Sequence, residues 1–76
     1  MKEFKRVSHD INIMGGKACI KGMRVTVGMI ITQLSEGKNF AGLLEEYPYL
    51  AEEDIAEALR YSAWLVNSSE MDVVTA

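Results

Sequence analysis

Two helix-breaking positions divide the second half of the chain, and this division constrains the fold more than any other feature. Gly37 and the pair Tyr47-Pro48 leave three segments with apolar residues at helical spacing. The first stripe consists of Val27, Ile30, Ile31 and Leu34. Its i, i+3, i+4, i+7 spacing predicts a helix, and glycine is typical of the position just after a helix. We therefore expect the first helix over about residues 27–36.

The second segment predicts a short helix. Its stripe is Phe40, Leu43, Leu44 and Tyr47. Asn39 precedes the stripe as a candidate N-cap, and Pro48 biases the residue before it away from helical angles. We expect this helix over about residues 40–46.

The third segment predicts the longest helix, over about residues 52–66. Three acids, Glu52, Glu53 and Asp54, occupy its first turn, where negative charge complements the helix dipole. The expected buried stripe is Ile55, Leu59, Ser62/Ala63 and Val66. Residues 67–76 show no periodicity, and we expect a frayed tail there. A short helix, a turn of about five residues and a longer helix, preceded by another helix, follow the order of a trihelical helix-turn-helix.

The first third of the chain predicts an extended arm. Val7, His9, Ile11 and Ile13 alternate with polar residues until Gly15-Gly16 interrupts the pattern. Residues 18–20 and 24–27 then flank Lys21-Gly22-Met23, which favours a small hairpin or paired arm. A two-stranded ribbon is marginal in water, so this arm needs a helix or a second chain beside it. We expect one domain over residues 1–76: arm 1–27, helical core 27–66 and tail 67–76.

Composition favours self-association in a reducing compartment. Hydrophobic residues make up 49% of the 76 residues, and with the six glycines the share is about 57%, above the roughly 45–50% usual when glycine is counted. A chain this small has little private core, so the surplus predicts a homo-oligomer, a dimer or larger. One cysteine and one histidine provide neither a disulfide nor a zinc set. No long apolar run follows the basic start, and we expect a cytoplasmic protein without a membrane partner.

Charge is distributed unevenly along the chain. Residues 1–38 carry seven basic and three acidic side chains, whereas residues 39–76 carry one basic and eight acidic side chains. This asymmetry suggests one side that faces a polyanion and one that repels it. Solvated faces without any partner explain it equally well, and the sequence leaves both interpretations open.

Catalytic motifs are weak throughout. Gly15-Gly16-Lys17 lacks the earlier glycine and the following Ser or Thr of a phosphate-binding loop, which favours a structural turn. His9-Asp10 lacks the further histidines of a metal-dependent phosphohydrolase, and a surface or dimer-contact role is favoured for His9. Cys19 is interpreted as a small residue buried in a strand. An enzyme that depends on Cys19 is a further hypothesis with weaker support from the sequence. We expect no enzymatic activity, no metal and no cofactor.

Several motifs occur in a specific order. They read GGKACIKGMRVTV at residues 15–27, EG at 36–37, EEYPYL at 45–50 and EEDI at 52–55. With these motifs the chain resembles the domain of unknown function family 433 over about residues 9–64. The family pattern is similar to GGKPxIxGTRIxV, a helix, GxS, a helix, and EYPxLTxEDI. Ala18 stands where proline is usual, Met23 where threonine is usual, and Ala51 where Ser or Thr would cap the third helix.

The resemblance implies a mainly α fold: a three-helix homeodomain-like helix-turn-helix bundle with a short N-terminal β arm. It also implies a VapB-type antitoxin, a small non-catalytic regulator that binds a PIN-like nuclease toxin, with operator DNA as a further expected partner. The alternative is a purely structural protein-protein interaction module that binds no nucleic acid. A neighbouring gene for a small PIN-like nuclease would favour the antitoxin.

The expected DNA contact avoids the third helix. In an ordinary helix-turn-helix the start of that helix enters the major groove, but here it carries Glu52, Glu53, Asp54 and Glu57. Four carboxylates without compensating cations repel phosphate. The candidate DNA-binding residues are therefore the basic side chains of the arm, namely Lys5, Arg6, Lys17, Lys21 and Arg24. The acidic helix is expected to face solvent or a basic toxin.

Overall fold

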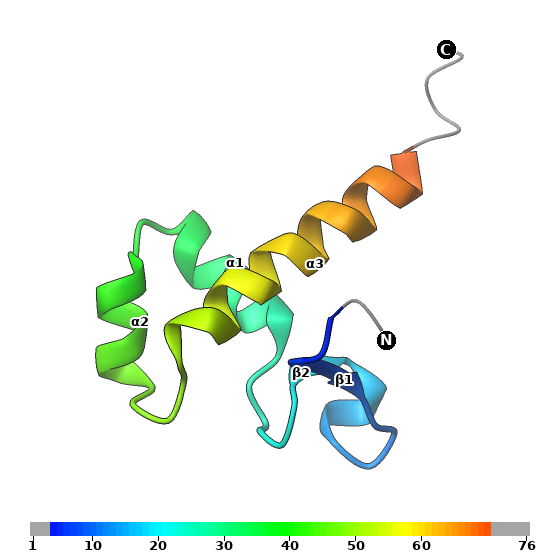
Figure 1. Cartoon of the computed structure of the whole chain (residues 1–76), viewed down its shortest axis with the longest axis horizontal. Coiled ribbons are helices and arrows are strands. Elements are labelled where there is room, and N and C mark those ends of the chain that lie inside the picture. The colour runs from blue at the N-terminus through cyan, green and yellow to red at the C-terminus, as the bar shows by residue number, and fades with distance from the viewer. Residues whose placement is uncertain (1–3, 71–76) are drawn as a thin grey trace.

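The computed structural model describes residues 4–70, which form a mainly helical fold with a small antiparallel sheet (Figure 1). The elements in chain order are strand β1 (Val7–His9), a 3-10 turn (Met14–Gly16), strand β2 (Ala18–Ile20), and helices α1 (Val27–Ser35), α2 (Phe40–Glu46) and α3 (Glu52–Glu70). The order expected from the sequence, an arm followed by three helices, is confirmed.

Local capping explains where the first two helices begin. The Thr26 side-chain oxygen accepts a hydrogen bond from the backbone N–H of Met29 at 3.0 Å, and α1 begins at the next residue, Val27. Asn39 Oδ1 accepts from the N–H of Gly42 at 2.8 Å, as its N-cap assignment predicts. Gly37 adopts a φ of 102°, a left-handed conformation that glycine accommodates without strain after a helix.

The arm pairs differently from the expected hairpin. Strand β1 pairs antiparallel with β2, with Val7 opposite Ile20 and His9 opposite Ala18. Between residues 18–20 and 24–27 there is an isolated bridge, Cys19 with Thr26. The chain turns tightly between these two segments, because the N–H of Met23 donates to the carbonyl of Ile20 at 2.9 Å, and α1 begins at residue 27. No room is left for a longer ladder there.

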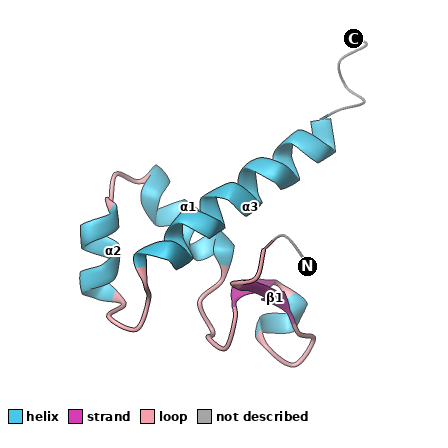
Figure 2. Cartoon of the chain, in the orientation of Figure 1, coloured by secondary structure: helices cyan, strands magenta, loops and turns pink. Residues whose placement is uncertain are grey.

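One core joins the arm to the helices. Ile20 of β2, Ile30 of α1, Leu43 of α2 and Ile55 of α3 are the largest fully buried side chains. Figure 2 shows the strands and loops of the arm gathered beside α1 and α3. The helical packing that a two-stranded arm requires is therefore present within the described chain.

The buried stripe of α3 is not the one expected from the sequence. Ile55 is buried as expected, but Leu59 is 40% exposed and Val66 51% exposed. The buried face continues instead through Ala58 and Tyr61. The arm packs against this face, and the later turns of α3 extend beyond the other helices (Figure 1). The spacing of apolar residues along α3 does not show against which face of the helix the arm packs.

Helix α3 is also longer than expected. It continues to Glu70, so residues 67–70 of the expected frayed tail are helical, while residues 71–76 lie outside the described residues. Within residues 4–70, no helix is both long enough and apolar enough to span a bilayer.

The start of α3 is half capped, and completing the cap is expected to stabilise the fold. Asp54 Oδ2 accepts a hydrogen bond from the N–H of Ala51 at 2.8 Å, which is one of the two bonds of a capping box. Alanine at position 51 supplies no side-chain oxygen for the second bond. We expect Ala51→Ser to raise the free energy of unfolding by about 0.5–1.5 kcal/mol, measured by urea denaturation.

A control for this prediction is Ala56→Ser, at an exposed position in the second turn of the same helix. Serine has a lower helix propensity than alanine, so this variant is expected to lose a few tenths of a kcal/mol. If Ala51→Ser behaves like Ala56→Ser, the cap assignment is wrong.

Candidate functional site

An open groove of about 950 Å³ lies between the arm, α1 and α3. The arm contributes His9 and Gly16–Ala18 to its wall, and α3 contributes Tyr61, Ser62, Leu65 and Val66. The remaining wall is Thr26–Met29 and Ile31–Gln33. Most of this surface is apolar, so the groove suits a hydrophobic partner better than a charged one.

The polar side chains of the groove wall are largely engaged within the chain. Gln33 donates from Nε2 to the hydroxyl of Tyr47 at 2.8 Å. The Tyr61 hydroxyl lies 3.2 Å from Nε2 of His9, within hydrogen-bond distance. Among residues 4–70, no group of three or more His, Cys, Asp or Glu side chains is placed to hold a metal ion. Four of the seven polar side chains on the wall are thus engaged, namely His9, Thr26, Gln33 and Tyr61, which leaves Lys17, Thr32 and Ser62 to contact a bound molecule.

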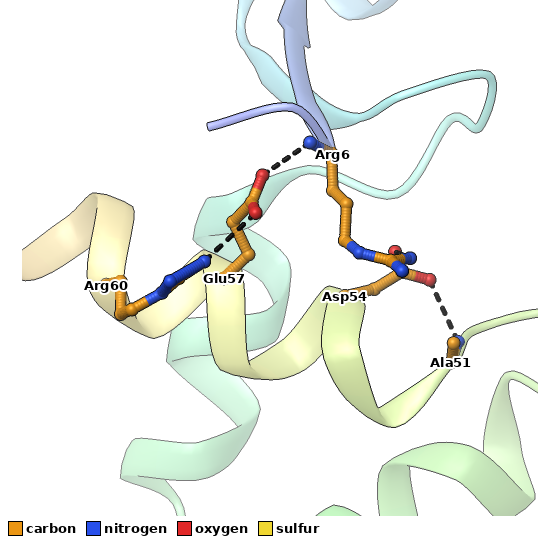
Figure 3. A network of polar contacts seen from close by, with 5 residues as sticks. All are labelled: Arg6, Ala51, Asp54, Glu57 and Arg60. Atoms are coloured by element: carbon orange, nitrogen blue, oxygen red, sulfur yellow. Dashed lines mark hydrogen bonds and ion pairs between the residues drawn. The ribbon is translucent and has the colours of Figure 1, made fainter. Parts of the chain in front are cut away.

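Asp54 and Glu57 of α3 hold the arm at Arg6, and Arg60 of the same helix pairs with Glu57; we name these four residues the arm clamp (Figure 3). Arg6 Nη1 lies 2.9 Å from Asp54 Oδ1, and the backbone N–H of Arg6 donates to Glu57 Oε2. Arg60 Nη2 lies 3.0 Å from Glu57 Oε1. The two carboxylates are buried, whereas the two guanidinium groups remain partly exposed. The clamp therefore connects residues about 50 positions apart.

The clamp also stabilises the charge of Arg6. The hydrogen bond with Asp54 raises the pKa of the Arg6 guanidinium, and desolvation opposes this rise. The charges of Asp54, Glu53 and Glu57 raise it further. Arginine is already protonated throughout the accessible pH range, so a raised pKa adds no pH dependence to folding there.

The acids of α3 do not form the solvent-facing cluster expected from the sequence. Glu52 and Glu53 are exposed, but Asp54 and Glu57 are buried against the arm. The acidic and basic halves of the chain meet at this contact, and part of the charge asymmetry is neutralised within the molecule. Asp54 and Glu57 are three residues apart and so lie on one face of α3, and the structure shows that this face, together with Ala58, is buried.

The structure separates the five basic candidate residues into three positions. Lys5, Lys21 and Arg24 are exposed around one end of the arm, where the N–H of Lys21 donates to the carbonyl of Arg6 at 2.7 Å. Arg6 belongs to the arm clamp, so its guanidinium is engaged by Asp54. Lys17 is exposed at the other end of β2, on the groove wall, four residues or roughly 13 Å from Lys21 along an extended strand.

An aromatic cluster adds to the contact between the arm and α3, and sequence reasoning missed it. Phe4 packs edge-on against Tyr61, with ring centroids 5.4 Å apart, and lies 5.7 Å from Trp64. The ring centroid of His9 also lies 6.1 Å from that of Tyr61. Phe4 stands alone in a charged stretch of the sequence, which carries no periodic signal for its burial. Cys19 is buried in β2, as expected for a structural cysteine.

These features define a small, mainly helical domain in which a two-stranded arm is clamped to the longest helix and leaves an apolar groove beside it. The chain belongs to the family described as protein of unknown function (DUF433), whose model matches residues 7–62. Its fold is similar to the crystal structure of a DUF433 member protein from Anabaena variabilis ATCC 29413, with a TM-score of 0.77 and 22% sequence identity, over 96% of this chain and 73% of that chain. No curated protein matches the chain at a significant level.

Proposed function

We propose that this protein is a small cytoplasmic, non-catalytic regulator of the antitoxin type, which binds a PIN-like nuclease toxin and operator DNA. The antitoxin role is what the family resemblance implies, and the order of short helix, five-residue turn and longer helix supports the helix-turn-helix part of the proposal. In the proposal, α1–α3 act as a homeodomain-like helix-turn-helix bundle whose DNA contact runs through the arm.

The observation that carries the proposal is the cationic end of the arm, formed by Lys5, Lys21 and Arg24. All three residues are exposed, and the arm that bears them is fixed to α3 by the clamp and by Phe4. Cations on a fixed ribbon meet phosphates with a smaller loss of conformational entropy than cations on a flexible tail. Phosphate contacts supply most of the sequence-independent affinity for DNA.

The start of α3 is less suited to this task. Glu52 and Glu53 remain exposed in its first turn, where an ordinary recognition helix would approach base edges. Arg6 is held by Asp54, so within this proposal it positions the arm rather than contacting phosphate. Lys17 lies on the groove wall, away from the cationic end of the arm, and is not counted among the phosphate contacts.

A binding titration on the promoter of the chain's own gene tests the proposal. If three cations per chain meet phosphate in a dimer, the six contacts should give a log-log salt slope of about −5. Lys21→Ala/Arg24→Ala removes four of the six contacts, and we expect at least tenfold weaker binding and a slope near −2.

The matched control is Glu52→Ala/Glu53→Ala, which removes two exposed charges of the opposite sign and leaves the clamp intact. We expect unchanged or tighter binding. Loss of binding in this control alone, with folding preserved, would show that α3 reads the DNA.

The apolar groove favours a second candidate function, a protein-protein interaction module without nucleic-acid binding. Absence of promoter binding by the unmodified protein, with no co-purification of a PIN-like nuclease encoded next to it, would support this alternative.

A further inference from the structure

The second half of α3 has a composition unlike the first. Five of the nine residues from Glu52 to Arg60 are charged, whereas residues 61–69 contain no Asp, Glu, Lys, Arg or His. Trp64, Leu65 and Val66 are nevertheless about half exposed. An exposed helical segment with large apolar side chains and no charge is typical of a surface that another molecule covers.

This segment is continuous with the apolar groove. Leu65 and Val66 form part of the groove wall, opposite Met29 and Ile31 of α1. Met29 is itself exposed, so the apolar surface extends from one helix across the groove to the other. A helix laid along the groove would cover both walls at once.

The distribution of charge indicates which helix fits the apolar groove. The chain carries a net charge of −3, so a contact between two copies is least unfavourable where the facing surfaces carry no charge. The groove and the exposed residues 63–68 provide such a surface, and among the described residues Lys17 is the one Lys, Arg, Asp or Glu on the groove wall. Helix α3 has no basic residue in its last turn, where a cation would complement the negative end of the helix dipole. Lys17 of a second copy would supply that cation if the end of α3 lay in the groove of that copy.

We propose that α3 of a second copy of this chain lies in the groove, so that two copies bury their uncharged α3 segments against each other around a two-fold axis. In this arrangement the two α3 helices run antiparallel and cross near Val66. The end of each helix then approaches the arm of the other copy, next to Lys17. The contact is isologous, so each copy both offers its helix and accepts one.

The engaged polar groups of the groove agree with a helix as its occupant. His9 and Gln33 are already paired with tyrosine hydroxyls, and Thr26 caps α1. A small ligand would need such groups free to fix its orientation, whereas an apolar helix face needs none of them.

This inference does not rest on the proposed function. Lys5, Lys21 and Arg24 do not line the groove, so the surface for the second copy is separate from the proposed phosphate contacts. A monomeric protein that still binds its promoter would overturn the dimer alone, and a dimer that binds no DNA would overturn the DNA proposal alone.

Sedimentation velocity of the full chain over a concentration series up to tens of micromolar tests the interface. The unmodified protein is expected to form a dimer with a dissociation constant in the micromolar range, as for a small interface. Val66→Glu places a charge in the groove wall, and we expect its dissociation constant to rise at least tenfold. Far-UV circular dichroism and thermal unfolding show whether the variant remains folded.

The matched control is Asn67→Glu, which adds the same charge one residue further along α3. Successive helical residues are about 100° apart, and Asn67 is exposed and does not line the groove. We expect its dimerisation to change less than threefold. Equal weakening in both variants, or a monomeric unmodified protein at tens of micromolar, would overturn the proposal.

A mixing experiment tests the two-fold arrangement directly. Val66→Lys alone is expected to dissociate like Val66→Glu, because like charges meet at the crossing point. An equimolar mixture of the two variants brings opposite charges together and is expected to recover much of the dimer. A mixture that associates no better than either variant alone would contradict an antiparallel crossing near residue 66.

Discussion

Ile55→Ala is expected to lower the free energy of unfolding by about 2–5 kcal/mol. The Ile55 side chain is 0% exposed and packs in the core that α3 shares with α1, α2 and the arm. Truncation removes its buried methyl groups and leaves a cavity that the neighbouring elements fill only in part. Small domains have total stabilities of only about 5–15 kcal/mol, so this single change removes a large share.

The control is Leu59→Ala, one turn further along the same helix. Apolar spacing assigned both residues to one buried stripe, but Leu59 is 40% exposed. We expect Leu59→Ala to cost less than about 1 kcal/mol, since much of its surface is already in contact with water. Urea denaturation monitored by circular dichroism measures both variants. Equal losses would show that the face of α3 has been assigned wrongly.

Glu57→Ala is expected to destabilise the fold by about 1–3 kcal/mol, because it removes the acceptor of the Arg6 backbone N–H. The same change removes the carboxylate that pairs with Arg60, although Arg60 is largely exposed and contributes less. Glu53→Ala, at an exposed position in the first turn, serves as the control and should change stability by less than about 0.5 kcal/mol.

Amide hydrogen exchange distinguishes a local loss of the arm clamp from a loss of stability throughout the fold. In Glu57→Ala the N–H of Arg6 should exchange faster relative to the amides of α2, which make no clamp contact. Glu57→Gln retains a side-chain oxygen as acceptor, and we expect its stability to lie between those of the unmodified protein and Glu57→Ala. Equal stability of Glu57→Ala and Glu53→Ala would contradict a structural role for the clamp.

The helices could be located from the sequence because the interactions that bound them are local. Asn39 bonds to an amide three residues away, and Gly37 adopts its left-handed conformation within the same turn. Pro48 acts on the residue immediately before it. Such signals lie within four positions of the helix ends they define, so α1 and α2 begin at the expected residues, and α3 begins at Glu52 as expected.

The candidate site was only partly predictable. Exposure of Lys5, Lys21 and Arg24 agrees with what their residue types suggest, and Lys17 is exposed as well. The sequence does not show that Lys17 and Lys21 lie at opposite ends of a strand that pairs with β1. It also does not indicate the groove, since the groove wall combines residues 9–33 with residues 61–66.

The sequence by itself determined the positions and order of the helices, the extended arm, and the amounts of charge and apolar surface available to them. The tertiary structure decided which face of α3 is buried and which charges remain free. The physical reason is distance along the chain: Arg6 meets Asp54 and Glu57 across 48 and 51 positions, and these contacts form when the arm packs on α3. Helical periodicity specifies an apolar face, but only packing against a distant segment determines what that face contacts.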